Sequence, residues 1–226
     1  FFFQEEDGIR DPLWSRGLGD VYKRQDYWDA AKEFLKKSDQ TLSKLIREYE
    51  NPSLSSRGDV FYTLIRSIIG QQISAKAADS VWARFEEMVV MIDPGSILSC
   101  SQQQLRECGL SNRKVEYIHG ISERWEVDFS SISWIEMDDD EAISKLTTLR
   151  GVGVWTSEMV LIFSLLRKDV FPLGDIGVIR AVEKLYNEGN KMDIAIIEQM
   201  AESWRPYRTV ATWYLWRSID SEPVAY

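Results

Sequence analysis

Histidine and cysteine are scarce in this chain. Its 226 residues include one histidine, His119, and two cysteines, Cys100 and Cys108. Two thiols cannot build a disulfide framework or a four-cysteine cluster, and a single imidazole cannot anchor a zinc site. We therefore expect a fold that is held together by its hydrophobic core, in a reducing compartment, and we expect a cytoplasmic location.

Long apolar runs and excess positive charge are also missing. No apolar segment reaches the roughly 18 residues that a membrane-crossing helix needs, so we expect no membrane contact. The net charge is −9, from 27 Lys and Arg against 36 Asp and Glu. An acidic surface releases few counterions, which disfavours broad electrostatic wrapping of nucleic acid. Local contacts through backbone amides remain open.

The first 25 residues differ in composition from the rest of the chain. Residues 1–25 contain Pro12 and three glycines and show no sustained helical periodicity. They also lack the basic start and small-residue cleavage site of a signal peptide. We expect residues 1–25 to be a non-native, adapter-like extension and residues 26–226 to form the folded domain. The alternative is a genuine N-terminal extension.

Apolar residues recur at spacings of three and four along residues 26–226, which is typical of amphipathic helices. Residues 60–69 place Phe61, Leu64 and Ile68 on one side before Gly70, and Ser74 is a good N-cap for the next helix. Further helical patterns cover residues 102–108, 111–125, 138–149, 156–166, 175–187, 193–204 and 208–219. No alternating strand pattern appears, so the sequence predicts an all-α fold.

Between two of these helical segments lies Gly151-Val152-Gly153, the turn of a hairpin that we predict near residues 146–158. Glycines permit a tight turn with exposed backbone amides. The helix that follows begins with unpaired N–H groups and a positive dipole end, which together can bind a phosphate. The alternative is a tight turn between packed helices that binds nothing.

Asp175 follows Pro172 and Gly174 at the start of a predicted helix, 22 residues after Gly153. Taken alone, a carboxylate there is a helix N-cap. The order of hairpin, helix and Pro-x-Gly-Asp before another helix resembles the helix-hairpin-helix DNA glycosylase superfamily. The resemblance covers about residues 59–216 and includes RSIIGQQISAKAA at 66–78, GLSNRKVEYI at 109–118 and WRPYRTVATWYLW at 204–216.

This resemblance is strongest to the bacterial 3-methyladenine DNA glycosylase II type, in a short form without the N-terminal β-rich domain. It implies two helical lobes with the helix-hairpin-helix and an active-site cleft between them. The implied partner is duplex DNA with alkylated bases, of the 3-methyladenine and 7-methylguanine type, bound by a monomer. The enzyme would flip the base out of the duplex and hydrolyse its N-glycosidic bond in base excision repair.

The resemblance also assigns roles to particular residues. Asp175 would stabilise the oxocarbenium ion or orient the attacking water. Relatives that also nick the strand have a lysine where this chain has Trp155, so a monofunctional enzyme is implied. Many relatives carry a four-cysteine iron–sulfur cluster, and two cysteines cannot form one.

Further residues fall on family positions for the base pocket and for DNA contacts. Trp155 and Trp216 would line the base pocket, with Trp216 stacking on the base; an electron-rich ring attracts a cationic purine by about 0.5–2 kcal/mol. Their alternative is core packing, which we expect for Trp82 and Trp125. The implied DNA contacts at the hairpin are Gly151, Val152, Gly153 and Thr156. Gln72 or its neighbour Gln71 would fill the gap left by the flipped base, unless the two belong to an ordinary polar loop. Arg208 would brace Asp175 or contact the DNA backbone, and the alternative is an exposed arginine in a salt bridge. The carbonyls of Thr147, Leu149 and Val152 would hold a monovalent cation.

Three other functions remain open at this point. The chain could be a glycosylase of the same fold for another damaged or mismatched base. It could be a non-catalytic helix-hairpin-helix DNA-binding module, although Asp175 argues against this because a carboxylate near phosphate hinders simple binding. The acidic net charge favours a third reading, a helical scaffold unrelated to nucleic acid.

Overall fold

A computed structural model describes residues 27–49, 54 and 59–219 of the chain. These residues form helices and connecting turns and contain no strand, which confirms the predicted all-α class. The interpretation of residues 1–25 as an extension lies outside the described residues.

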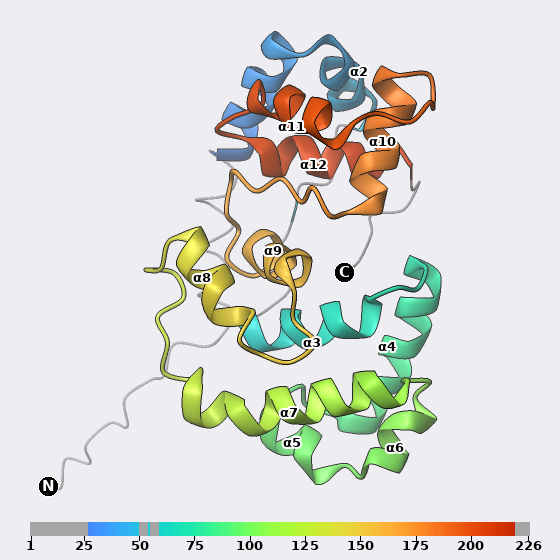
Figure 1. The fold of residues 1–226 in the computed structure, drawn as a ribbon, viewed down its shortest axis with the longest axis vertical. Helices are drawn as coiled ribbons and strands as arrows, with labels where there is room; N and C mark the ends of the chain where they lie inside the picture. Colours follow the sequence, from blue (N-terminus) through green and yellow to red (C-terminus); the bar gives the residue numbers. More distant parts are fainter. Residues whose placement is uncertain (1–26, 50–53, 55–58, 220–226) are drawn as a thin grey trace, which may run out of the picture.

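The helices form two lobes (Figure 1). One lobe holds α3 (Val60–Gly70), α4 (Ala75–Val89), α5 (Pro94–Ser99), α6 (Gln102–Glu107), α7 (Asn112–Asp128), α8 (Asp139–Leu146) and α9 (Val154–Phe163). The other holds the helical residues 27–38 together with α2 (Gln40–Glu48), α10 (Ile176–Tyr186), α11 (Ile194–Glu202) and α12 (Arg208–Arg217). Residues 164–175 therefore lead from the first lobe back to the second.

Helix α3 forms the centre of the first lobe. It packs against α4, α7 and α9, and nearly all of its side chains are buried. Trp82 and Trp125 lie in this core, as predicted, where their rings stack on Phe85 and Phe129. In the second lobe α12 packs against α2 and α10, so helices from near both ends of the described residues close one core.

Short polar residues begin most of the helices, and among them are Ser74 and Asp175, the two positions that the sequence marked as N-caps. The side chain of each of these residues accepts a hydrogen bond from an amide in the first turn that follows: Asp39, Asp59, Ser74, Asp93, Ser101, Ser111, Asp138, Asp175 and Asp193. Such a cap stabilises a helix by about 1 kcal/mol. Among α2 to α12, only α9 and α12 lack a cap from the preceding side chain. At α12 the amide of Arg208 donates to Asp169 Oδ1 instead, at 3.3 Å.

Helix α9 differs from its predicted limits of 156–166. It starts at Val154, directly after the hairpin, and ends at Phe163. Leu166 has a φ of 53°, a left-handed conformation that turns the chain into residues 164–175. The apolar pattern runs on past the helix because Leu165 and Leu166 pack against the core from this turn.

Candidate active site

The hairpin between α8 and α9 is built around one glycine that cannot be replaced without strain. Gly151 has a φ of 91°, and a Cβ atom there would lie 2.4 Å from the ring of Tyr117. Gly153 is extended, with a φ of −105°, and a Cβ atom there would meet nothing within 4 Å. Val152 is buried, and its amide donates to the Leu149 carbonyl at 3.1 Å. The fold therefore requires Gly151, whereas the open space at Gly153 is available to a ligand.

The first turn of α9 opens from this hairpin. Gly153 supplies no side-chain cap, and Val154 is 56% exposed. The positive end of the α9 dipole is therefore not opposed by a capping carboxylate. Thr156 is the third residue of α9, and its side chain is buried. Any contact between Thr156 and DNA is thus left to its backbone.

Gln71 joins the α3–α4 loop to the hairpin. Its Nε2 donates to the Gly151 carbonyl at 3.0 Å and to Thr156 Oγ1 at 2.9 Å. Both hydrogens of the Gln71 amide are therefore used within the protein. Gln72 is exposed, with a φ of 60°, and Ile73 beside it is 40% exposed. Of the two glutamines, Gln72 is the one presented to a ligand.

Lys114, which the sequence analysis did not single out, supports the same loop. Its ammonium donates to the Ile69 carbonyl at 2.7 Å and to the Gln71 carbonyl at 2.8 Å, so it caps the end of α3. Burial lowers the pKa of Lys114. The signal was present in the segment GLSNRKVEYI, which was recognised as a family stretch without a role for its lysine.

Asp175 lies where the two lobes meet, and it is 5% exposed. Its Oδ1 accepts from the Val178 amide at 2.8 Å and from Trp216 Nε1 at 3.1 Å, and its Oδ2 accepts from Trp155 Nε1 at 2.7 Å. Asp175 is therefore an N-cap and a site residue at once. A Cβ atom at Gly177 would lie 2.9 Å from Oδ1, so this glycine makes room for the carboxylate.

The two tryptophans reach Asp175 from different lobes, Trp155 from α9 and Trp216 from α12. Trp216 is 3% exposed and stacks on Phe163, with ring centroids 5.8 Å apart. Trp155 is only partly buried. The structure thus brings together the three residues that the sequence assigned to catalysis and the base pocket. The three N–H donors are uncharged, so they orient the carboxylate without neutralising its charge.

Glu158 is a further carboxyl group near Asp175 that the sequence analysis missed. It follows Trp155 by three positions, so both side chains leave the same side of α9. Burial, and then the negative charge of Asp175, raises the pKa of Glu158 to about 7. The segment WTSE shows this spacing, but nothing in the sequence indicates that the glutamate and the aspartate come close.

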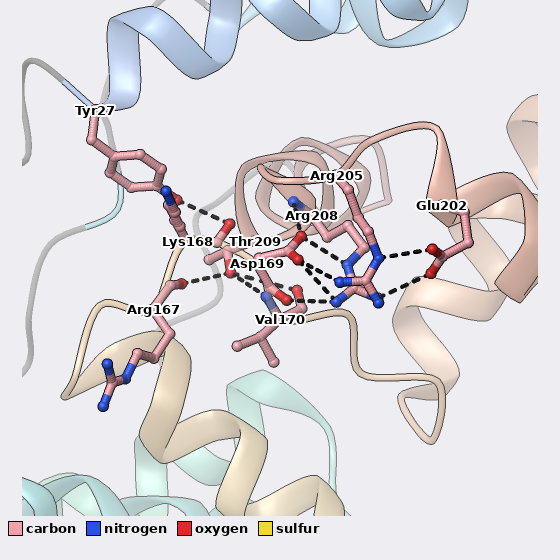
Figure 2. A network of polar contacts seen from close by, with 9 residues as sticks. All are labelled: Tyr27, Arg167, Lys168, Asp169, Val170, Glu202, Arg205, Arg208 and Thr209. Atoms are coloured by element: carbon pink, nitrogen blue, oxygen red, sulfur yellow. Dashed lines mark hydrogen bonds and ion pairs between the residues drawn. The ribbon is translucent and has the colours of Figure 1, made fainter. Parts of the chain in front are cut away.

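Arg208 forms a salt bridge, which was the alternative to its implied roles at Asp175 and at the DNA backbone. Its Nε donates to Asp169 Oδ1 at 2.8 Å, and its side chain is 16% exposed (Figure 2). Arg205 and Glu202 complete this ion-pair cluster. The expected bracing of Asp175 by Arg208 is therefore not formed. Asp169 lies in the connection between α9 and α10, and its charge draws Arg208 to that segment.

Thr209, next to Arg208, also helps to hold the connection between the lobes. Thr209 Oγ1 donates to the Arg167 carbonyl at 2.6 Å and accepts from the Val170 amide at 2.9 Å (Figure 2). The amide of Thr209 donates to the Lys168 carbonyl at 3.1 Å. These bonds tie the start of α12 to the segment that leads to Asp175.

The three carbonyls expected to hold a cation belong to the hairpin. The described residues give a hydrogen bond to one of them, the Leu149 carbonyl, from the Val152 amide. The neighbouring carbonyls of Thr148 and Gly151 accept from the side chains of Arg124 and Gln71. A carbonyl oxygen has two lone pairs, so the donor set of Thr147, Leu149 and Val152 remains compatible with a monovalent cation.

Residues 65–206 match the sequence profile of the HhH-GPD superfamily of base excision DNA repair proteins. The chain belongs to this superfamily. DNA-3-methyladenine glycosylase 1 of Schizosaccharomyces pombe is 30% identical over 188 residues, which cover 78% of this chain and 80% of the relative. The family resemblance read from the sequence is thus confirmed.

Solved structures give the same assignment. The S. pombe 3-methyladenine DNA glycosylase in complex with abasic DNA superposes with a TM-score of 0.76 at 28% identity and covers 84% of this chain and 96% of its own. The DNA-3-methyladenine glycosidase of Bacillus halodurans has a TM-score of 0.67 at 34% identity, over 82% and 86% of the two chains. An 8-oxoguanine glycosylase/lyase of Clostridium acetobutylicum, at 16% identity, shares the fold alone.

The described residues contain neither a metal-binding cluster nor a membrane-spanning helix. No group of three or more His, Cys, Asp or Glu side chains there is placed to hold a metal ion. Nor is any described helix both long and apolar enough to cross a membrane.

Proposed function

We propose that this protein is a monofunctional DNA glycosylase that excises alkylated purines from duplex DNA in base excision repair. The main support for a glycosylase is Asp175, a buried carboxylate that accepts hydrogen bonds from three neutral N–H donors at the junction of the lobes. It stands beside a helix-hairpin-helix whose second helix has no side-chain cap. The relatives named as 3-methyladenine glycosylases support alkylated purines as the substrate class.

The hairpin would bind a DNA phosphate through the backbone amides of Gly151 and Gly153, and such a contact reads no base sequence. Val152, which was also expected to contact DNA, is buried and donates its amide to the Leu149 carbonyl. Carbonyl oxygens of the same turn would hold a monovalent cation beside that phosphate. Gln72, exposed at the tip of its loop, would fill the space of the flipped base. We expect the protein to act as a monomer, because the proposed contacts all come from one chain.

Chemistry follows from the position of the carboxylate. As the N-glycosidic bond breaks, the base leaves with the bonding electrons and positive charge develops on the sugar. Asp175 stabilises this charge, and water adds to C1′ with loss of a proton. Trp155 cannot form an imine, so the strand is left intact. The partly exposed indole of Trp155 would form the aromatic wall that attracts a cationic purine. Trp216 is 3% exposed and stacks on Phe163, so it packs in the core and would hold the Asp175 carboxylate instead of stacking on the base.

The direct test is incubation of the purified protein with methylated duplex DNA, followed by chromatography of the released free bases. We expect 3-methyladenine and 7-methylguanine in the free-base fraction and an intact abasic strand. Borohydride should trap no protein–DNA adduct. Absence of both released bases would contradict the proposed substrate class, and a trapped adduct would contradict the monofunctional mechanism.

A further inference from the structure

We propose that Glu158 is a second catalytic carboxyl group of this site, which donates a proton to the departing base when that base is a neutral damaged purine. This inference rests on the proposed glycosylase function. It concerns substrates whose glycosidic bond has not already been weakened by a positive charge on the base.

The exposure of α9 shows where Glu158 points. After Val154, the partly exposed positions of this helix are Trp155 and Glu158, and the rest of α9 is buried. Trp155 uses its exposed side to reach Asp175 Oδ2 at 2.7 Å. Residues three apart on a helix share a side, so Glu158 lies next to the Trp155 indole on the side that faces Asp175.

The charged groups on the neighbouring helices are engaged elsewhere. Helix α9 packs against α3 and α8. Among the described residues, Asp175 is the charge that acts on Glu158. Most side chains of α3 and α8 that carry charge or titrate have other partners: Tyr62 donates to Glu86, Arg66 pairs with Asp79, Lys145 lies over Phe129, and Asp139 pairs with Arg167. The remaining two, Asp140 and Glu141 of α8, are exposed.

The surroundings of Glu158 and Asp175 favour a proton-donor role for the first and a charge-stabilising role for the second. Burial and the charge of Asp175 raise the pKa of Glu158 to about 7, so a large fraction of Glu158 is protonated near neutral pH. Asp175, bonded by three N–H donors, is built as an acceptor. Carboxyl pairs whose environments separate their pKa values commonly act as acid and as charge stabiliser.

The step balances in atoms and charge. The proton of Glu158 passes to a ring nitrogen of the purine while the bond from C1′ to the base breaks, and the electron pair stays with the base. The base departs neutral. Water then adds to C1′, and its proton returns to the Glu158 carboxylate. An alkylpurine that is already cationic departs neutral without this proton, so it does not need Glu158.

The experiment compares single-turnover release of hypoxanthine, a neutral base, with release of 3-methyladenine, a cationic one. Three proteins are used: wild type, Glu158→Gln and the control Glu198→Gln, which alters an exposed glutamate on α11. General acid catalysis is worth about 10²–10⁴-fold, so Glu158→Gln should slow hypoxanthine release by about 10²-fold or more. Release of 3-methyladenine should change little, and Glu198→Gln should change neither.

The pH dependence supplies a readout that a structural role would not move. Hypoxanthine release by the wild type should fall as the pH rises above about 7, because Glu158 must be protonated. This decline should be missing in Glu158→Gln, and missing for 3-methyladenine in the wild type. Melting curves of the variants establish that folded proteins are compared.

The experiment distinguishes failure of the glycosylase function from failure of the proton-donor role of Glu158. If the wild type releases no alkylated base, the proposed function itself fails. If it releases 3-methyladenine but no hypoxanthine, or if Glu158→Gln slows both bases equally, the proton-donor role is overturned. If Glu158→Gln does not fold, the wild-type pH profiles decide: identical profiles for the two bases would overturn the proposal.

Discussion

Asp39 and Asp175 are two aspartates with nearly the same local chemistry and different surroundings. Each caps a helix through its Oδ1, and each accepts a hydrogen bond from a tryptophan Nε1. The partners of Asp39 at Oδ2 are Tyr186 and Trp204, both from the second lobe. The indole partners of Asp175 come from both lobes. Asp39 therefore joins helices of one core, whereas Asp175 joins the lobes next to the hairpin.

The starts of α9 and α10 extend this contrast. Helix α10 is closed by the Asp175 carboxylate, while α9 has Gly153 and no side-chain cap. A capped N-terminus fixes an anion that belongs to the protein, and an uncapped one can receive an anion from outside. The two helix starts together place an uncapped helix N-terminus and a buried carboxylate at one junction, where the proposed function requires a phosphate site and a catalytic group.

The largest effect should come from Asp175→Asn, with Asp39→Asn as its matched control. Both variants keep an amide oxygen for the cap and turn an NH2 group towards N–H or O–H donors, so each should lose about 1–3 kcal/mol of stability. Only Asp175→Asn should also lose about 10²–10⁴-fold in base release, since it removes the charge next to the developing cation. Free-base release and thermal melting measure both. An equal loss of base release in the two variants would show that Asp175 has no catalytic role beyond that of Asp39.

The second largest effect should come from changes in the hairpin, which lies near Asp175 and not near Asp39. Gly151→Ala places a Cβ at positive φ against Tyr117, and we expect it to cost about 1–3 kcal/mol of stability and to weaken DNA binding. Gly153→Ala meets no protein atom, so its stability should be nearly unchanged. Melting temperatures and binding to an abasic-site duplex test this. A stable, tightly binding Gly151→Ala protein would show that the turn adapts.

Substitutions of Gln71 and Gln72 should have smaller effects, on stability for Gln71 and on base flipping for Gln72. Gln71→Ala removes donors from the Gly151 carbonyl and from Thr156 Oγ1, and should destabilise the protein by about 1–2 kcal/mol. Gln72→Ala should leave stability unchanged and reduce base flipping, which a fluorescent base analogue next to the lesion reports. The assignment of Gln72 to the gap would be wrong if this variant flipped bases like the wild type.

The smallest effect is the dependence of stability on pH at Glu158. Its pKa is raised in the folded state, so the folded state binds a proton more tightly than the unfolded one. Protonated Glu158 therefore contributes to the free energy of unfolding. This contribution is complete below the pKa of Glu158 in the unfolded chain and is lost as the pH rises through about 7. Glu158→Gln should therefore lose less stability than the wild type between pH 5 and 8, as measured by urea unfolding. Parallel curves for the two proteins would show that burial and the charge of Asp175 do not raise the pKa of Glu158.

Much of the fold could be predicted from the sequence because its signals are local. Ser74 and Asp138 begin helices as their spacing indicates, and Gly109 breaks the chain with a φ of 97°. The end of α9 was misplaced, because the apolar pattern does not distinguish a helical residue from a buried turn. Leu166 continues the pattern while its backbone has already left the helix.

The site was partly predictable for the same reason. Local order and family resemblance pointed to Asp175, Trp155 and Trp216, and the structure brings these three together. Arg208 could not be placed, because its partner Asp169 is 39 residues away and competes with every other carboxylate. Lys114 and Glu158 were missed, because their relevance depends on what lies beside them in space.

By itself, the sequence determined the helices, the caps at Ser74 and Asp175, the Gly-Val-Gly turn and the superfamily, since each depends on residues close together in the chain or on a recognisable order of motifs. The tertiary structure decided which capping aspartate stands at the junction of the lobes and which glutamine is exposed. It also decided which carboxyl group faces Asp175. Burial, hydrogen bonding and electrostatic coupling depend on distances in space, and the residues involved come from helices far apart in the sequence.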